Sequence, residues 1–503
     1  METMSGAPNK PDPSLFLSVA SPLVMTVKPS SAIQQHVLPH HPQRFFLGQG
    51  GMNGSHSLGL HVSPRRIVKR CSHTNKASSL SRAHPSLQMS KMAFYVSPPT
   101  QSKRSPKLAH YTLSRSQPNA LLPHSQQKDC LTDLPYELAM HVLSYLDLPD
   151  LLQVSQLSRS WHMLYRSDDV WRPRLVSAHQ EGRWSPIPSK LALMGNELLH
   201  VYQQRHQLDK RWASGSVVTY PLFGHGNSVY CSQFDDTKIM TGSRDHTIKA
   251  WDMATLRCVH TLRGHSGSVL CLQYNASIMV SGSSDHSLIV WDMNTFQPLR
   301  QLKGHRGGVV GLSMDDRYIV SCSKDSTIMI WDIHTFELLR VIQAHHGAVN
   351  GVQLHGDRIV SAGSDSLVKM WDVHSGACLR EFVGHTRGLA CVQFDGKQIV
   401  SGSNDRTIRV WNAETGECSM VCEGHVDLVR TLHFKDDRIV SASYDQSVRV
   451  WDAKTGACLL NFQCGHKSWV LDVQFDKKRI ISASQDHTAL VMNFSHGLDT
   501  RYL

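Results

Sequence analysis

Short apolar stretches separated by polar turns recur from residue 214 to the end of the chain. Strings such as "SVLCLQY", "IMVSGS", "SLIVWD" and "PLRQLKG" follow one another, and each is short enough, and rich enough in small and β-branched residues, to be a strand. Tryptophan marks the same place in successive units, at positions 251, 291, 331, 371, 411 and 451. A spacing of 40 residues with four strand-like stretches in each unit predicts a repeat protein built of four-stranded antiparallel sheets.

Each unit also carries a histidine, a serine or threonine, and an aspartate. The aspartate stands six residues before the tryptophan, and seven such sets occur, although the last set lacks the tryptophan. Seven copies of a hydrolase triad in one chain would be strange, whereas seven copies of a structural device are what a repeat protein needs. In such a sheet, the turns that carry the histidine and the aspartate lie at the same end, so we expect these side chains to meet. We therefore predict no catalytic residue in these sets.

The Gly-His and Trp-Asp marks at this period resemble WD repeats, over residues 214–503. The resemblance implies a seven-bladed all-β propeller, in which the histidine, aspartate, hydroxyl and tryptophan of each blade form a buried polar network. The last repeat ends soon after its third strand, "ALVMNF", and "SGSVVTYPL" (214–222) precedes the first repeat without a blade of its own. We expect this segment to supply the missing outer strand of the seventh blade.

Residues 129–176 have a different, helical pattern. Leu134, Leu138, Val142 and Leu146 recur at every fourth position, "DLPD" (147–150) predicts a break, and a second helix and a short third element follow. The strings "LPYEL", "VLSYLDLPDLL" and "SRSWHMLYRSDDVWR" resemble an F-box. That resemblance implies docking to the small Skp adaptor, and through it to a cullin scaffold. The matching positions are Leu134, Pro135, Leu138, Leu143, Leu146 and, more loosely, Trp171. The alternative is that these residues form only an internal three-helix core.

Two further zones flank the F-box segment. Residues 177–213 are predicted to be a linker, helical from about residue 189, that acts as a stiff spacer. Residues 1–128 are rich in Ser, Pro, His and Gln and show no sustained period, so we expect a disordered tail. Its cluster "RRIVKR" (65–70) is either a nuclear-import or nucleic-acid contact, or simply a solvated basic stretch.

Charge and cysteine content narrow the class of function. The tail holds 15 of the 52 Lys and Arg residues but only Glu2 and Asp12 of the acids, so the remainder is close to neutral. The 12 cysteines have no close CxxC pairs and indicate reduced thiols, and Cys418-x-x-x-Cys422 is too weak a pattern for a metal site. No run of 18 apolar residues predicts a membrane span, and a secretory signal at Leu15–Val27 is disfavoured. No P-loop or nucleophile elbow occurs.

Recognition in a propeller belongs to its rims. Two positions in each blade are predicted to face one rim, namely the fifth residue after the histidine and the residue before the aspartate. Unlike the network, they differ between blades, and the candidates for binding substrate are Arg430, Tyr444, Arg244, Lys324 and Tyr230. The pair Arg430 and Tyr444 resembles part of a phosphodegron pocket of F-box/WD-repeat receptors. The preceding blade has Ala390 and Asn404 there, which leaves phosphate dependence open.

The expectation is therefore a multidomain, non-catalytic substrate receptor of a Skp–cullin–F-box ubiquitin ligase. Its partners would be the Skp adaptor, the cullin and phosphorylated or acidic peptides, without a cofactor or metal, in the cytoplasm, the nucleus or both. The alternative is a WD-repeat scaffold without a ligase role, associated with nucleic acid through its tail, although we do not expect nucleic acid as a partner. Homodimerisation stays open.

Overall fold

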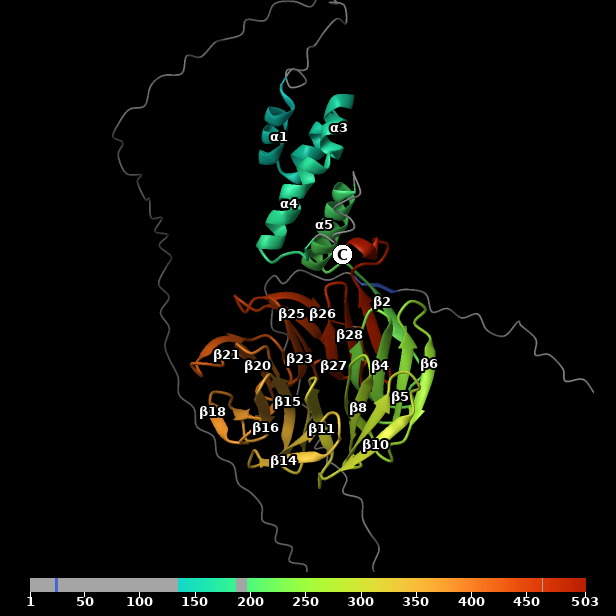
Figure 1. The fold of residues 1–503 in the computed structure, drawn as a ribbon, viewed down its shortest axis with the longest axis vertical. Coiled ribbons are helices and arrows are strands. Elements are labelled where there is room, and N and C mark those ends of the chain that lie inside the picture. Colours follow the sequence, from blue (N-terminus) through green and yellow to red (C-terminus); the bar gives the residue numbers. More distant parts are fainter. Residues whose placement is uncertain (1–22, 26–133, 187–196, 464) are drawn as a thin grey trace, which may run out of the picture. The chain divides into compact units, whose positions relative to one another are not determined.

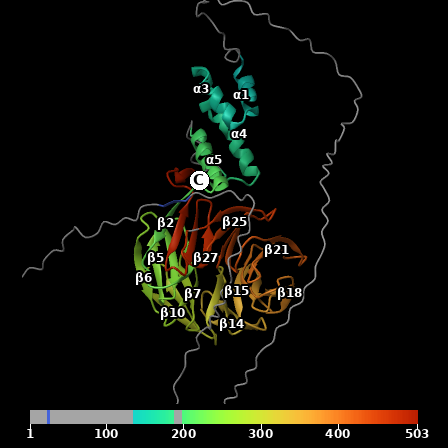
Figure 2. The same ribbon diagram turned by 180° about the vertical axis from the view of Figure 1, so that it is seen from behind.

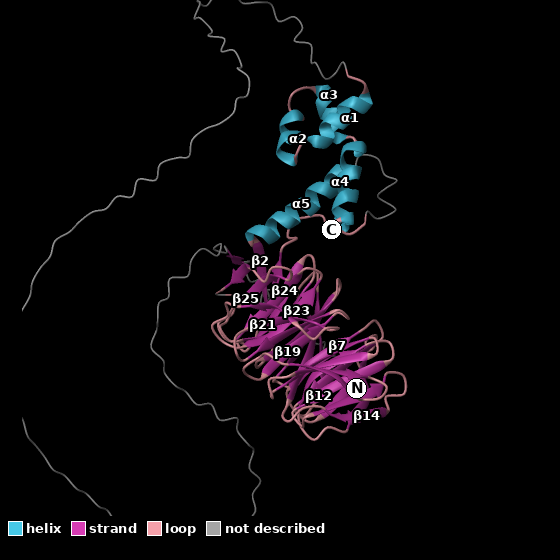
Figure 3. Cartoon of the chain, turned by 90° about the vertical axis from the view of Figure 1, so that its left-hand side faces the viewer, coloured by secondary structure: helices cyan, strands magenta, loops and turns pink. Residues whose placement is uncertain are grey.

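The computed structural model describes residues 23–25, 134–186, 197–463 and 465–503, and all helices and strands below lie within these ranges. Apart from the short strand β1 (Leu23–Met25), the α-helices come first along the chain and the strands follow (Figure 3). The rest of the predicted tail, including its basic cluster, and the first residues of the predicted linker helix lie outside the described residues.

Four short helices, where the sequence predicted three, form the F-box segment. They are α1 (Tyr136–Tyr145), α2 (Leu148–Val154), α3 (Arg159–Arg166) and α4 (Asp168–Gln180). The predicted break at "DLPD" is the start of α2, where the Asp147 carboxylate accepts a hydrogen bond from the Asp150 N–H at 3.0 Å. The predicted second helix is wrong as a single element, because Ser158 caps a new helix through the Trp161 N–H.

The buried residues of these helices are not the residues of the apolar stripe that the sequence indicated. Leu143 and Trp171 have no exposed surface and pack in one cluster with residues of α2, α3 and α4, whereas Leu138 is 52% exposed. Arg174 fastens α1 to α4, since its guanidinium donates to the main-chain oxygens of Leu143 at 2.7 Å and Leu146 at 2.8 Å. Both oxygens lie at the C-terminal end of α1, and that of Leu143 also accepts the Leu146 N–H at 3.3 Å.

Seven antiparallel sheets follow, confirming the predicted seven-bladed propeller. The first strand of each sheet, called strand a, lies around the centre of the ring, and the fourth, strand d, lies at its outside, as both ribbon views show (Figures 1 and 2). The a strands are β3 (Val229–Phe234), β7 (Val269–Tyr274), β11 (Val309–Met314), β15 (Val349–His355), β19 (Leu389–Phe394), β23 (Val429–Lys435) and β27 (Val470–Phe475). They begin blades 1 to 7 in that order.

The remaining strands repeat with the same regularity. The b strands are β4 (Lys238–Ser243), β8 (Ile278–Ser283), β12 (Tyr318–Ser323), β16 (Arg358–Gly363), β20 (Gln398–Ser403), β24 (Arg438–Ser443) and β28 (Arg479–Ser484). The c strands are β5 (Thr247–Asp252), β9 (Ser287–Asp292), β13 (Thr327–Asp332), β17 (Val368–Asp372), β21 (Ile408–Asn412), β25 (Val448–Asp452) and β29 (Ala489–Asn493). The d strands of blades 1 to 6 are β6 (Cys258–Arg263), β10 (Pro298–Lys303), β14 (Leu338–Gln343), β18 (Cys378–Phe382), β22 (Cys418–Cys422) and β26 (Cys458–Phe462).

The ring closes as the sequence predicted. Strand β2 (Val217–Leu222), which precedes the first blade in sequence, pairs antiparallel with β29 and completes blade 7. This blade also takes a fifth strand, β1, which the sequence did not predict.

Neighbouring blades are joined by side chains on strand a that bind the main chain of the next strand a. Gln233 Oε1 accepts the Tyr274 N–H at 2.6 Å, and Gln273 Oε1 accepts the Met314 N–H at 2.8 Å. His433 takes the equivalent place in blade 6, where its Nδ1 accepts the Phe475 N–H at 3.3 Å.

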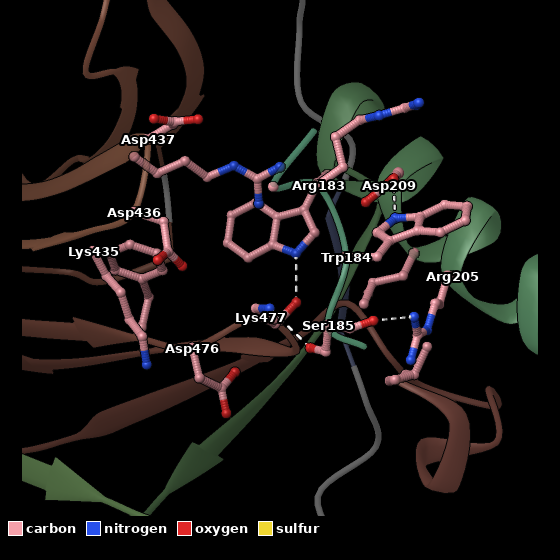
Figure 4. Close-up of a pocket in the computed structure, with 16 residues that line it drawn as sticks. Arg183, Trp184, Ser185, Arg205, Asp209, Lys435, Asp436, Asp437, Asp476 and Lys477 are labelled. Atoms are coloured by element: carbon pink, nitrogen blue, oxygen red, sulfur yellow. Dashed lines mark hydrogen bonds between the residues drawn. The ribbon is translucent and has the colours of Figure 1, made fainter. Parts of the chain in front are cut away.

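The linker helix α5 (Leu198–Ser214) is packed against blades 6 and 7 rather than free. Its Trp212 stacks on Phe494 with ring centroids 3.8 Å apart and donates its indole N–H to the Lys477 carbonyl. Its Arg205 donates to the carbonyls of Ser185 and Tyr502, the latter in the short helix η3 (Thr500–Tyr502). Ser185, Arg205, Trp212 and Lys477 line a cavity of about 240 Å³, beside which Figure 4 shows Trp184 bound to Asp209. The role of a stiff spacer stays a prediction.

Candidate functional site on the propeller rim and the helices

The His–Asp–hydroxyl network is present in all seven blades. Blade 6 is representative, because His425 Nδ1 lies 2.8 Å from Asp445, and His425 Nε2 lies 2.7 Å from Ser441 Oγ. A carboxylate only accepts hydrogen bonds, so Nδ1 carries the proton and Nε2 accepts from the serine hydroxyl. Trp451 donates its indole N–H to the same hydroxyl at 2.8 Å. Ser441 has no exposed surface, so this triad-like set fastens the blade and is closed to any substrate.

Burial sets the protonation state of this network. It lowers the pKa of His425, as it does for His225, His265, His305 and His345. Burial also opposes ionisation of Asp445, but hydrogen bonds from His425 and Ser447 outweigh it and hold the pKa of that carboxyl well below its usual range. The folded state therefore keeps these imidazoles neutral and the aspartates charged.

We expect the propeller to lose stability on acidification, starting below about pH 6.5. Between that ordinary histidine pKa and the lowered folded pKa values, the unfolded chain binds protons that the folded chain does not, so the free energy of unfolding falls as the pH falls. The aspartates, with lowered pKa values, act in the same direction below about pH 4. Urea unfolding at pH 7.5, 6.5 and 5.5 measures the effect.

His433 offers a matched control for this prediction. Burial lowers its pKa to about 4, so by linkage it accounts for about 1.3 kcal/mol of the loss between pH 7.5 and pH 5.5. Glutamine stands at the equivalent place in blades 1 and 2 and accepts the same main-chain N–H. The variant His433→Gln should fold and show a shallower pH dependence; an unchanged slope would contradict this assignment.

A β-bulge aims one residue of every blade toward the centre of the ring. The pairing of strand a with strand b shifts register at the fifth residue after the histidine in all seven blades, which is how bulges re-aim side chains. The bulged residues line a central cavity of about 150 Å³ and are Tyr230, Leu270, Val310, Asn350, Ala390, Arg430 and Leu471. The predicted substrate residues Arg430 and Tyr230 therefore lie at this cavity, and both are half-buried.

Arg430 is the one cation among the described residues that line the central cavity. Within the described chain its guanidinium has neither an ion pair nor a hydrogen bond. Asp472 also lines the cavity, but its carboxylate accepts the main-chain N–H of Ser232 at 2.6 Å and the hydroxyls of Ser232 and Thr431. Burial raises the pKa of Asp472. The guanidinium of Arg430 is thus left with donors for an incoming anion.

The second predicted set lies in the turns between strands b and c. Its members are Arg244, Ser284, Lys324, Ser364, Asn404, Tyr444 and Gln485, and each donates its main-chain N–H to the turn that follows the blade's histidine. Arg244 and Lys324 are exposed and Tyr444 is half-buried. The structure thus brings the two turns of every blade together at one rim, as predicted.

This rim carries cations without acidic partners. The cations are Arg244, Arg306, Lys324, Arg387, Arg406, Arg430 and Lys467, and none of them forms an ion pair within the described chain. Two kinds of turn form this rim: those between each network histidine and the following strand a, and those between strands b and c. Besides the seven network aspartates, Asp427 is the one acidic residue in these turns. At the other end of the blades, in or beside the turns between strands a and b, several cations are paired, as in Lys238–Asp235 at 2.7 Å and Arg317–Asp357 at 2.8 Å, although Lys397 and Lys477 form no ion pair within the described chain.

A flat aromatic pair adjoins the rim between blades 6 and 7. Tyr444 and Trp469 stack with ring centroids 4.2 Å apart and an angle of 3° between the planes, and Trp469 is 38% exposed. Stacked rings of this kind offer an apolar face beside the cations of the rim. The sequence had indicated Tyr444, but not its contact with Trp469.

The F-box helices expose a set of large apolar side chains. They are Tyr136, Leu138, Val142, Tyr145, Leu152, Leu157 and Met163. An apolar surface of this kind on a small helical unit marks an interaction site. Sequence reasoning did not single out Leu157 and Met163, because it treated α2 and α3 as one helix.

The predicted adaptor residues divide between this surface and the core. Leu138 and Pro135 are exposed, and Leu134 and Leu146 are half-buried. Leu143 and Trp171 are fully buried, and their side chains hold the helices together. That these two residues take part in adaptor binding stays a prediction. Arg406 was also missed on the rim, although its place directly after the network aspartate is visible in the sequence.

Within the described residues no group of three or more His, Cys, Asp or Glu side chains is placed to hold a metal ion. Burial raises the pKa of the thiols of Cys271 and Cys391 beside the central cavity to about 12, which makes them poor nucleophiles. None of the described helices is long and apolar enough to cross a membrane.

Family models match both parts of the chain. An F-box-like model matches residues 131–176, and the model of the WD domain, G-beta repeat, matches five segments within 216–412. The chain belongs to the F-box/WD-repeat family. A model of the TEP-1 C-terminal beta-propeller matches residues 425–476, in blades 6 and 7 of this F-box/WD-repeat protein.

Curated relatives of this F-box/WD-repeat protein align with about a quarter of the chain. "Probable E3 ubiquitin ligase complex SCF subunit sconB" of Arthroderma otae is 31% identical over 163 residues, which are 27% of this chain and 24% of that protein. "F-box/WD repeat-containing protein 7" of Drosophila melanogaster is 35% identical over 27% of this chain and 11% of its own length. "Cell division control protein 4" of Candida albicans is 30% identical over 27% of this chain and 22% of its own length. The matched part thus spans less than a quarter of the length of each of these three relatives.

One solved structure, the computationally designed Ika8 protein, covers 54% of this chain and 98% of its own at a TM-score of 0.46 and 29% identity.

Proposed function

We propose that this chain is the substrate-recognition subunit of a Skp–cullin–F-box ubiquitin ligase. The F-box helices bind the Skp adaptor, and the propeller rim binds an acidic or phosphorylated peptide of the substrate. The propeller contributes proximity to the ubiquitin-transfer site and not chemistry.

The exposed apolar face of the F-box helices supports the first half of the proposal. Leu138 and Leu157 are 52% and 69% exposed on a unit whose core is already filled by Leu143 and Trp171. A small module that keeps large apolar side chains outside gains free energy when a partner covers them. The relatives that carry the printed name of an SCF subunit make the Skp adaptor the partner of choice.

The unpaired cations of the rim are the main observation in support of the second half of the proposal, that the rim binds an acidic or phosphorylated peptide. Cations without acidic partners surround a cavity that itself holds the half-buried guanidinium of Arg430. Clustered cations raise the local concentration of an anionic ligand, and arginine binds phosphate or carboxylate through paired donors. The Tyr444–Trp469 pair supplies an apolar contact beside the anion.

Peptide selection tests this class of substrate. A degenerate peptide library, prepared with phosphothreonine, glutamate or threonine at one fixed position, is applied to the purified full chain. We expect enrichment of the phosphothreonine pool, and a roughly 10- to 100-fold loss of affinity for the selected peptides in Arg430→Ala, because a charge-assisted hydrogen-bond pair is lost.

Arg317→Ala is the control for this experiment, since Arg317 is an exposed arginine whose charge is already paired with Asp357 in a turn between strands a and b. It should bind the selected peptides like the wild type. Equal affinity of Arg430→Ala and wild type, or no enrichment of either anionic pool, would refute the assignment of this rim.

A further inference from the structure

Blade 7 differs from the other six blades in having five strands. The additional strand β1 pairs antiparallel with the outer edge of β2, with Leu23 opposite Thr219, Val24 opposite Val218 and Met25 opposite Val217. In blades 1 to 6, by contrast, strand d is the last strand of its sheet. The seam of the ring is thus the one place in the described chain where an outer edge is paired.

A proline and a helix end set the length of this paired edge. Pro221 limits the ladder at one end, because proline has no N–H to donate. At the other end β2 begins at Val217, directly after Gly215 terminates α5 with a φ of 67°. The accepting stretch is therefore Val217–Thr219, and its partner is the start of the apolar, β-prone segment "LVMTV" (23–27).

Pro221 also determines which atoms of β2 face outward. It lies opposite Leu490 of β29 but has no N–H for that strand, so its main-chain nitrogen faces the outer edge. Hydrogen-bonding directions alternate along a strand, so the N–H groups of Val217 and Thr219 also face outward, and that of Val218 faces β29. By the same alternation, Leu23 and Met25 bond to β2, and the N–H of Val24 points away from it.

We propose that the outer edge of β2 is a strand-accepting docking site for an extended apolar segment, and that Leu23–Met25 of the same chain occupies it. The recognition is through the main chain, as in other cases where a peptide adds a strand to a sheet edge. Three residue pairs make a short ladder, so the segment is exchangeable. The site is separate from the rim, and it does not depend on the ligase role.

Amide hydrogen exchange at single-residue resolution tests the proposal in the full chain. In the wild type, the outward amides of Val217 and Thr219 should exchange more slowly than the outward amides of β6, a free edge. Met25→Pro removes a donor to β2 and should speed exchange at Val217 and Thr219 about tenfold.

Val24→Pro is the matched control, because the N–H that it removes points away from β2, and exchange at Val217 and Thr219 should stay slow. A peptide of residues 21–28, added to Met25→Pro, should restore protection, and the same peptide with proline at position 25 should not. Equal exchange in wild type and Met25→Pro would overturn the site. Protection that rises with protein concentration would overturn occupancy within one chain, because the strand would then come from a second copy.

Discussion

Leu138→Asp should abolish association with the Skp adaptor while leaving the protein folded. Leu138 is 52% exposed on α1, so the substitution removes little core packing. In a complex, however, it places a carboxylate among apolar side chains, which combines the loss of an apolar contact with the cost of burying a charge. We expect affinity for the purified adaptor to fall at least about 100-fold, measured by surface plasmon resonance. Leu157→Asp, at another exposed leucine of the F-box segment, should behave alike.

Leu299→Asp is the control for this prediction. Leu299 is a leucine of nearly equal exposure, 53%, on the outer strand β10 of the propeller, and its replacement should leave adaptor binding unchanged. If Leu138→Asp bound the adaptor with wild-type affinity, the assignment of the docking face to the F-box helices would be wrong. A wild-type chain that binds no adaptor at all would favour the alternative of a WD-repeat scaffold without a ligase role.

Trp171→Ala should unfold the F-box helices, at a cost of about 3–5 kcal/mol. Trp171 has no exposed surface, its ring contacts those of Tyr165 and Tyr202, and its indole N–H donates to the Tyr165 carbonyl at 2.6 Å. Four short helices have few other contacts to compensate for such a cavity. Differential scanning calorimetry and limited proteolysis should show loss of the helical unit, with the propeller transition retained.

Trp469→Ala provides the comparison, since it removes a tryptophan of the same size that is 38% exposed on the rim. It should leave both transitions in place and weaken peptide binding instead. Trp171→Ala will also lose the adaptor, but through unfolding. If it lost the adaptor with an intact helical transition, Trp171 would be a contact residue after all, as the sequence had predicted.

The repeated residue pattern of the propeller allowed much of its structure to be predicted from the sequence. The repeat of Trp, His, Asp and hydroxyl positions predicted the blades, their strands, the buried network and the closing strand 214–222, because every blade repeats the same local contacts. Each of seven copies confirms the others, so a single exception such as Met492, which stands where the other blades have tryptophan, does not obscure the pattern.

The helical segment lacked this redundancy. A stripe at every fourth position showed that α1 has an apolar face, and Leu138 and Leu143 both satisfied the F-box resemblance. Sequence alone could not tell which residue turns inward, because a helix that binds a partner is apolar on two sides. The tertiary contacts of α4 with α1 decided it in favour of Leu143.

The sequence by itself thus determined the class of fold, the number of blades and the structural role of the triad-like residues. These follow from residue spacing, which is local and repeated seven times. Tertiary structure alone decided which F-box residues are exposed, that a bulge turns Arg430 toward the central cavity, that the rim cations have no acidic partners within the described chain, and that Leu23–Met25 pairs with β2. Each of these depends on contacts between residues far apart in the chain, and such contacts leave no period in the sequence.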